Sequence, residues 1–228
     1  MAVIEATMVL YAKEVVTPDR VVAAIQRFTH GQETPDLPQD FEEGLLLWVN
    51  HSQKALTKRI QMEMEKEGME NDRRIPRFPE VKDIKGLCDG AGLAALISFY
   101  CPEELPWTDI KIPYLPTVSD SVHNLCLVHE FSHHSLPFTV CHMMPEDVTY
   151  LRGNMKQNLL VLLADLFNVL EIHPVKCVRF PGYERNRECK FFGGFLMWVF
   201  WEENLGESFS MSFFFHNFFL EIFFCINL

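Results

Sequence analysis

Residues 155–173, MKQNLLVLLADLFNVLEIH, constrain the fold of this chain more than any other segment. The sequence predicts a helix here, which Asn154 begins and Pro174 ends. Between residues 159 and 170 apolar side chains would point to nearly every side of the helix axis. A helix of this kind belongs at the centre of a domain, where other helices surround it. We therefore expect a helical bundle with this segment in its middle.

Helix signals recur through the first 180 residues, and no stretch alternates in polarity for long enough to predict a strand. Asp40 and Glu43 form a start that resembles a capping box, while Thr17 and Pro18 predict an earlier helix start. The expected helices cover residues 2–13, 18–28, 42–67, 86–100, 121–134 (with a start at Ser119 and Asp120) and 155–173, with a short helical turn from Met144. Proline interrupts residues 69–80 and 101–118, which we expect to be connections. The sequence predicts an all-α fold.

Composition narrows the class of function. A chain of 228 residues can bury a full core, and its net charge of −11 argues against nucleic acid as a partner, because phosphates are bound by Lys and Arg.

The seven Cys are odd in number and form no C-x-x-C, so we interpret them as core thiols in a reducing compartment, not disulfides or zinc ligands. The first residues carry no basic segment typical of a signal peptide, which favours the cytoplasm.

Residues 129–133, HEFSH, match the H-E-x-x-H pattern of zinc hydrolases. Two histidines four apart share one face of a helix and can bind the metal, while the glutamate activates the bound water. The elongated zinc-protease pattern needs a third histidine at a position that this sequence fills differently, so His142 or Glu146 would have to serve. Two half-buried, hydrogen-bonded histidines on a helix are the alternative that we favour. The residues of the hydrolase hypothesis are His129, Glu130 and His133.

Residues 90–95, GAGLAA, match the G-x-G-x-x-A turn of dinucleotide-binding proteins. That turn binds pyrophosphate only where a strand precedes it, and none is predicted here. We therefore interpret Gly90 and Gly92 as positions of close helix packing. Trp48, inside LLLWVN, is expected in the core, while Trp107 suits a core or a binding position equally.

The only dense basic run in the first 180 residues is Arg73, Arg74 and Arg77. A partner surface and a solvated loop explain this run equally well. We therefore predict no catalytic, cofactor-binding, metal-binding or contact residue from the sequence, and we expect no cofactor.

Four segments, in this order and spacing, resemble the calponin-homology domain: LLLWVN, LCDGAGLAALISFYCPE, SVHNLCLVHEF and MPEDVTYLRGNMKQNLLVLLADLF. With VTPDRVVAAIQRF before them, they are most similar to the variant in the Patronin family, the calmodulin-regulated spectrin-associated proteins, and especially to its invertebrate members. The resemblance covers about residues 1–183. It implies a calponin-homology helical bundle over residues 36–183 with an N-terminal helical extension over residues 1–35.

The resemblance implies a non-enzymatic cytoskeletal binding module of the cytoplasm and cytoskeleton. Its family binds and stabilises microtubule minus ends, so tubulin, spectrin and calmodulin are the implied partners. Minus-end recognition in the family is attributed to a C-terminal CKK domain that coiled coils precede, and the sequence resembles a chain truncated before both. Actin binding does not follow, because it usually requires two calponin-homology domains in tandem. The alternative hypothesis is a zinc metallohydrolase that uses HEFSH.

Residues 184–228 resemble nothing in that family. Twelve of the 20 Phe lie between residues 191 and 224. We interpret this Phe-rich tail as an aberrant or alternative C-terminus. The other hypothesis is a membrane anchor over residues 209–228, although Glu221 inside it would cost about 2.5–3.5 kcal/mol on insertion. A membrane is a partner only under that second hypothesis.

Overall fold

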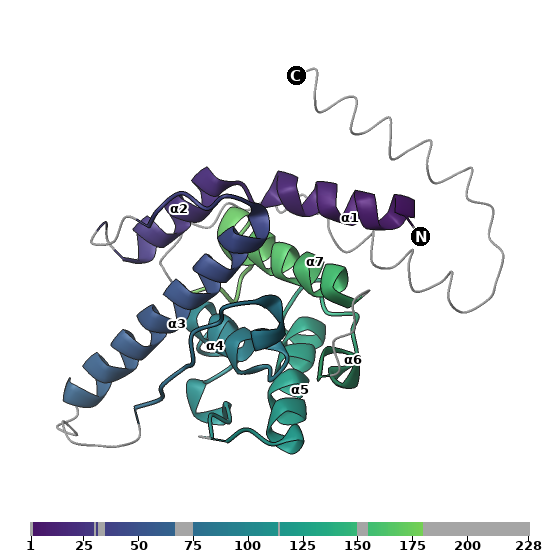
Figure 1. Ribbon diagram of the computed structural model, residues 1–228. Coiled ribbons are helices and arrows are strands. Elements are labelled where there is room, and N and C mark those ends of the chain that lie inside the picture. Colours follow the sequence, from purple (N-terminus) through teal and green to yellow (C-terminus); the bar gives the residue numbers. More distant parts are fainter. Residues whose placement is uncertain are drawn as a thin grey trace. The chain divides into compact units, whose positions relative to one another are not determined.

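A computed structural model describes residues 2–29, 31, 35–66, 75–113, 115–149 and 155–179. Within these ranges the regular elements are all helical, which confirms the all-α prediction (Figure 1). In chain order they are α1 (Ala2–Val15), α2 (Pro18–Phe28), α3 (Phe41–Lys66), η1 (Ile84–Leu87), α4 (Ala91–Tyr100), η2 (Trp107–Asp109), α5 (Val118–His134), α6 (Pro145–Thr149), α7 (Met155–Phe167) and η3 (Asn168–Ile172).

Helix α7 lies at the centre of the described core, as the sequence predicts. Every residue from Asn158 to Phe167 is buried. Helices α1, α3 and α6 and the 3-10 turn η1 all pack against α7, and Figure 1 shows α1 lying along it. The last turn, η3, widens to π-helix before the chain leaves the helix at His173. Because neighbours surround α7, its apolar side chains are removed from water on all sides.

The two N-terminal helices belong to the same core. Helix α1 packs on α7, and α2 packs on α3. Met8 and Ala12 of α1 and Val21 and Ile25 of α2 are buried. Helix α1 ends two residues later than the predicted 2–13. Helix α2 matches its predicted bounds, with Pro18 at its start. The N-terminal extension therefore contributes buried surface to the helical bundle.

Helix α3 begins much as the sequence predicts. The Asp40 Oδ1 atom accepts the backbone N–H of Glu43 at 2.8 Å. In a capping box the Glu43 carboxylate would accept the backbone N–H of Asp40. Here it accepts the backbone N–H of the preceding residue, Gln39, at 2.6 Å. The helix is described to Lys66, and the predicted end at Gly68 lies outside the described residues.

The helix expected over residues 86–100 is shorter than predicted. Its first residues form η1 and a turn, and α4 begins at Ala91. The reason is Gly90, whose φ of 70° is left-handed and cannot continue a right-handed helix. A Cβ at Gly90 would lie 2.9 Å from the Leu125 backbone nitrogen, so α5 approaches this glycine closely. Close helix packing at the GAGLAA segment is thereby confirmed.

Helix α5 begins slightly before its predicted start. Thr117 is its N-cap, and a complete capping box links the Thr117 and Asp120 side chains to each other's backbone N–H. The connection before it, expected to lack regular structure, contains the short 3-10 turn η2. The helical turn expected from Met144 is α6.

Within the described ranges, no helix has both the length and the apolarity needed to cross a membrane. The Phe-rich tail, residues 184–228, lies outside the described residues, so its two interpretations stay predictions. Among the described cysteines, all of which are free thiols, Cys101, Cys141 and Cys177 are buried, as expected of core residues, whereas Cys88 and Cys126 are only half-buried.

Candidate functional site

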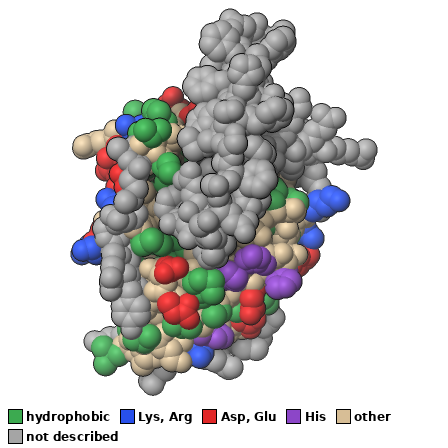
Figure 2. All heavy atoms as spheres, turned by 90° about the vertical axis from the view of Figure 1, so that its right-hand side faces the viewer, with side chains coloured by type: hydrophobic (Ala, Val, Ile, Leu, Met, Phe, Trp, Pro, Cys, Tyr) green, Lys and Arg blue, Asp and Glu red, His purple; other side chains and the backbone are tan. Residues whose placement is uncertain are grey.

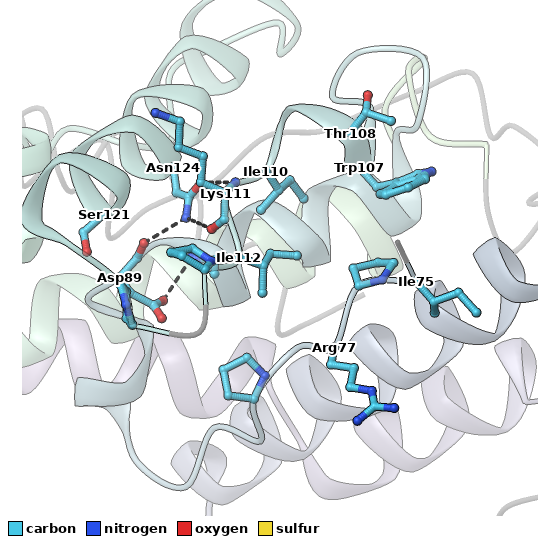
Figure 3. A pocket seen from close by; sticks show the side chains of 15 residues that line it. Ile75, Arg77, Asp89, Trp107, Thr108, Ile110, Lys111, Ile112, Ser121 and Asn124 are labelled. Carbon is cyan, nitrogen blue, oxygen red and sulfur yellow. Dashed lines mark hydrogen bonds between the residues drawn. The ribbon is translucent and has the colours of Figure 1, made fainter. Parts of the chain in front are cut away.

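A groove of about 940 Å³ lies where the N-terminal ends of α4 and α5 meet two connecting segments (Figure 3). Residues of segment 75–79 form one wall, and residues of segment 107–116 form the other. Asp89 and Ala91 at the start of α4 and Ser121 and Asn124 of α5 complete the lining. Ligand pockets in proteins run from about 300 to 1,000 Å³, so this volume is at the upper end of that range.

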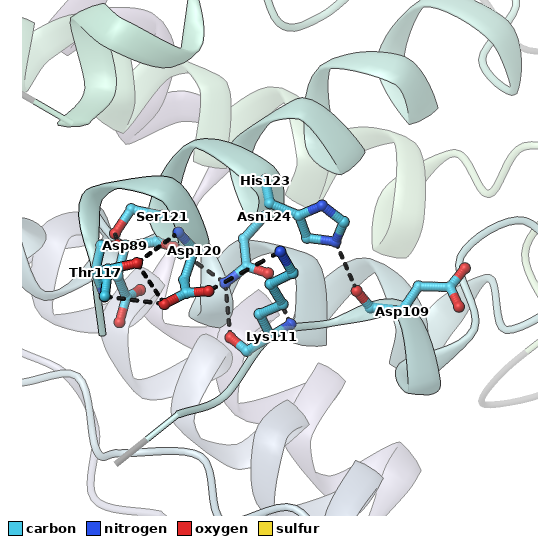
Figure 4. A network of polar contacts seen from close by, with 8 residues as sticks. All are labelled: Asp89, Asp109, Lys111, Thr117, Asp120, Ser121, His123 and Asn124. Carbon is cyan, nitrogen blue, oxygen red and sulfur yellow. Dashed lines mark hydrogen bonds and ion pairs between the residues drawn. The ribbon is translucent and has the colours of Figure 1, made fainter. Parts of the chain in front are cut away.

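Two asparagine side chains hold the walls in place. The Asn124 Oδ1 atom accepts the N–H of Lys111 at 2.9 Å, and its Nδ2 atom donates to the carbonyls of Lys111 at 2.9 Å and Asp89 at 3.3 Å (Figure 4). Asn50 of α3 exchanges two bonds of 2.8 Å with the backbone of Val81, just beyond the other wall. The connecting segments lack regular backbone partners, and each carboxamide bonds their N–H and C=O groups instead. These bonds fix the walls of the groove in the absence of a ligand.

The carboxylate in the lining is engaged by backbone. The Asp89 Oδ1 atom accepts the N–H of Ala91 at 3.0 Å, at the start of α4. Burial raises the pKa of Asp89, and the backbone N–H groups of Ala91 and Gly92 oppose that rise. A carboxylate at a helix N-terminus also faces the positive end of the helix dipole. Asp89 therefore stabilises the start of α4.

Two basic side chains stand at the rim of the groove. Arg77 is exposed and makes no ion pair with any residue that the structure describes. Lys111 is 47% exposed, and its Nζ atom lies 4.0 Å from the Asp120 Oδ1 atom. The hydrogen bond from Thr117 lowers the pKa of Asp120, which keeps that carboxylate charged. Water screens an exposed pair at this distance, so the attraction is weak and Lys111 can exchange Asp120 for another carboxylate.

The HEFSH residues lie on the second half of α5. The His129 and His133 rings are in contact, with centroids 4.2 Å apart, and the Thr139 hydroxyl lies 3.3 Å from the His133 Nδ1 atom. Burial lowers the pKa of His129, and the neighbouring His133 lowers it further. His129 is half-buried as expected, but His133 is exposed, because α5 turns this face toward solvent. Histidine side chains gather on the face shown in Figure 2.

The hydrolase hypothesis finds no complete ligand set in the described part of the chain. No group of three or more His, Cys, Asp or Glu side chains there is placed to hold a metal ion. His142 is half-buried, and burial together with His133 lowers its pKa. Glu146, the other candidate for a third ligand, is exposed on α6.

The remaining candidates divide between the core and the groove. Trp48 is fully buried and donates from Nε1 to the Tyr100 hydroxyl at 2.8 Å, so its core assignment is confirmed. Trp107 is half-buried, packs on the core and lines the groove, which makes it both a core and a surface residue. Of the basic run, Arg77 lies at the groove, whereas Arg73 and Arg74 lie outside the described residues.

Sequence reasoning missed the residues that shape the groove, above all Asn124 and Lys111. One signal was available for Asn124. It stands four and seven residues before Val128 and Phe131, which are buried on the inner face of α5. A polar residue in that register is buried and needs partners, so it marks a place where α5 must bind backbone. Nothing in the local sequence identifies Lys111.

Comparison with known proteins assigns the family. The family model described as "CAMSAP CH domain" matches residues 69–152. Patronin of Drosophila melanogaster is 52% identical over 188 residues, which cover 81% of this chain and 12% of Patronin. Calmodulin-regulated spectrin-associated protein 1 of Xenopus laevis is 30% identical over 185 residues, which cover 73% of this chain and 12% of that protein.

Calmodulin-regulated spectrin-associated protein 2 of Mus musculus is 31% identical over 192 residues, which cover 75% of this chain and 13% of that protein. The chain thus spans about an eighth of the length of these curated relatives. No solved structure matches the chain significantly. With its order of helices, the chain belongs to the family of Patronin and the calmodulin-regulated spectrin-associated proteins, and it carries their calponin-homology (CH) domain.

Proposed function

We propose that the chain acts as a non-enzymatic binding module of a protein that binds and stabilises microtubule minus ends. The similarity to Patronin, 52% identity over 188 residues, is the observation that carries this proposal. Identity of this extent over 81% of the chain supports a shared surface as well as a shared fold. The module would act in the cytoplasm, on the cytoskeleton.

Spectrin and calmodulin are further proposed partners. Both appear in the names of relatives that are 30% and 31% identical to this chain. Those relatives are much longer than the chain, so each partner has to be tested on this chain directly. Tubulin is proposed from the resemblance to the minus-end binding family.

The chemistry of the groove supports binding more than catalysis. Its Asp89 carboxylate and Asn124 carboxamide are engaged by backbone groups of the chain itself. A general acid or base needs a proton-accepting atom within hydrogen-bond reach of a substrate. Apolar side chains and two exposed cations remain available at the groove, and these are features of a contact surface.

Co-sedimentation of the full chain tests the proposal. We expect the chain to pellet with microtubules or with spectrin above its own background, and a Ca²⁺-calmodulin column to retain it if calmodulin is a partner of this domain. Centrifugation of the chain without any partner gives this background. Recovery of the chain in the supernatant with every one of these partners would contradict the proposal.

Metal analysis tests the alternative hypothesis on the same preparation. The binding-module proposal expects purified protein without stoichiometric zinc and with the helical circular dichroism of the described fold. One zinc per chain that is lost in a His133→Ala variant, together with hydrolytic activity, would favour the metallohydrolase instead.

A further inference from the structure

The groove between segments 75–79 and 107–116 combines apolar walls with a basic rim. Its lining includes three isoleucines, Trp107 and four prolines, and its two cations are Arg77 and Lys111 (Figure 3). The side chains of Arg77 and Lys111 stand on opposite sides of the groove in this view. The one carboxylate in the lining, Asp89, is bonded to the first turn of α4.

The polar groups within the groove leave little for a ligand to bond. The Asn124 carboxamide makes three bonds to backbone, and the Ser121 hydroxyl donates to the Thr117 carbonyl at 3.2 Å. Just beyond the lining, a His123 ring nitrogen lies 2.9 Å from the Asp109 carbonyl oxygen. A small polar metabolite, which is recognised through several convergent hydrogen bonds, fits such a site poorly. Burial of apolar surface and attraction to the rim cations are the interactions that remain.

We propose that this groove binds a short acidic segment of a protein partner, a segment in which a few Asp or Glu residues alternate with apolar ones. The inference rests on the proposed function, because it assumes that the chain is a binding module, and it names the chemistry of the partner. The apolar side chains of the segment pack on Trp107 and the isoleucine and proline walls. Its carboxylates pair with Arg77 and Lys111.

The charge distribution favours a short acidic segment over an extended polyanion as the ligand of the groove. The whole chain carries a net charge of −11, so a nucleic acid or an anionic membrane meets repulsion over most of the surface. Charges are screened beyond about 8 Å at physiological ionic strength. Of the three charged side chains in the lining, two are the cations Arg77 and Lys111, and the third, Asp89, accepts the Ala91 N–H, so a segment confined to the groove meets two cations and one engaged carboxylate there. Lys111 gives up only its 4.0 Å contact with Asp120 on binding.

The test uses the full chain and a short fluorescein-labelled peptide in which Glu alternates with Leu and Pro. Fluorescence anisotropy compares this peptide with a matched one in which Gln replaces every Glu. We expect the wild type to bind the Glu peptide about tenfold more tightly than the Gln peptide, a ratio that falls toward one as salt rises. The variant with both Arg77→Glu and Lys111→Glu should lose that preference.

A Lys54→Glu variant is the matched control. Lys54 is exposed on α3 and does not line the groove, so its reversal changes net charge without changing the site. It should bind the Glu peptide as the wild type does. A Trp107→Ala variant should weaken binding of both peptides, because it removes apolar surface. Circular dichroism establishes that each variant is folded.

Three results would overturn the inference: equal binding of the Glu peptide by the wild type and the double variant, binding of neither peptide by the folded wild type, or groove-dependent binding of phosphatidylserine vesicles in place of the peptide. Sedimentation of the same samples keeps the two proposals apart. If the wild type pellets with a cytoskeletal partner but does not bind the peptide, only the groove inference fails. If it binds the peptide but pellets with no partner, only the proposed function fails.

Discussion

Gly90 holds a backbone conformation that other residues adopt only at a cost. Its φ is 70°, and an added Cβ would meet the Asn124 Cβ atom and the Leu125 nitrogen at 2.9 Å. A left-handed conformation costs a residue with a Cβ about 1–2 kcal/mol, and overpacking costs about 1–3 kcal/mol more. We expect Gly90→Ala to lower the free energy of unfolding by about 2–5 kcal/mol, measured by urea denaturation.

Gly31 is the matched control for that substitution. Its φ is 71°, but nothing lies within 4 Å of the position of an added Cβ. Gly31→Ala should therefore cost only the backbone term, about 1–2 kcal/mol. If the two substitutions cost the same, the close approach of α5 to Gly90 is not what makes that position sensitive.

Asp165 makes stability depend on pH near neutrality. Its carboxyl is buried in α7 and accepts the Tyr11 hydroxyl at 2.5 Å, and burial raises its pKa from 3.8 to about 7. The folded protein thus holds this proton more tightly than the unfolded chain does. The stabilisation from protonated Asp165 is fully present below pH 3.8 and is lost as pH rises toward 7.

The measurement compares wild type with Asp165→Asn, which stays neutral and can still accept from Tyr11. We expect the wild type to lose up to about 4 kcal/mol relative to this variant as the pH rises through that window, followed through urea unfolding at each pH. Above about pH 8 the difference should be constant. A difference that does not change between pH 4 and 8 would mean that Asp165 titrates normally.

At the scale of the element, α5 depends on its capping box. The Thr117 Oγ1 atom accepts the Asp120 N–H at 3.2 Å, and the Asp120 carboxylate accepts the Thr117 N–H at 3.0 Å. Loss of a Thr cap costs about 0.5–2 kcal/mol. We expect Thr117→Ala to destabilise the protein by about 1 kcal/mol, measured by urea denaturation.

Thr7→Ala on α1 is the control for the cap. The Thr7 hydroxyl bonds the Val3 carbonyl within its own helix, and it caps nothing. Alanine is the better helix former, so this substitution should be neutral or slightly stabilising, by a few tenths of a kcal/mol. Equal losses in the two variants would argue against a capping role for Thr117.

The helix bounds show how much of the fold can be predicted from residues that are close together in the sequence. Capping residues and prolines predict where α2, α3 and α7 lie, because a helix end depends on side chains within one turn of it. The start of α4 is missed, since GLCDGAGLAALISFY is a plausible helix until Gly90 is known to be left-handed. Helix α5, which lies more than thirty residues farther along the chain, also leaves no room for a side chain at this position.

At the scale of the whole molecule, one buried network joins four elements. Trp48 of α3 donates to the Tyr100 hydroxyl at 2.8 Å, and that hydroxyl donates to Glu171 of η3. Arg27 of α2 forms an ion pair with the same carboxylate. Because Tyr100 is fully buried, removing its hydroxyl takes the hydrogen-bond partner from the Trp48 indole and one hydrogen bond from Glu171, which keeps its ion pair with Arg27.

We expect Tyr100→Phe to destabilise the fold by about 2–4 kcal/mol in urea denaturation. A double-mutant cycle with Trp48→Phe separates the hydrogen bond from the loss of packing. The double variant should be about 1 kcal/mol more stable than the sum of the single losses predicts, because the orphaned indole N–H is removed as well. Additive losses would show that the two side chains are not coupled.

The groove is also a property of the whole molecule. Its walls come from segments about thirty residues apart, and Asn50 and Asn124, which hold them, come from different helices. Proline content predicts that both segments are connections, but not that they face each other. Arg77 could be singled out as part of a basic run, whereas Lys111 gains its significance only from Arg77 on the opposite side of the groove.

The sequence by itself determined the all-α class, the buried centre and the family. A helix that is apolar all round requires a bundle about it, and the order of several long segments is specific enough to identify the CH domain. The tertiary structure decided the break at Gly90, the bond between Tyr11 and Asp165 and the opposition of the groove walls. Helix formation depends on residues within a few positions of one another, whereas these features depend on how helices distant in sequence pack together.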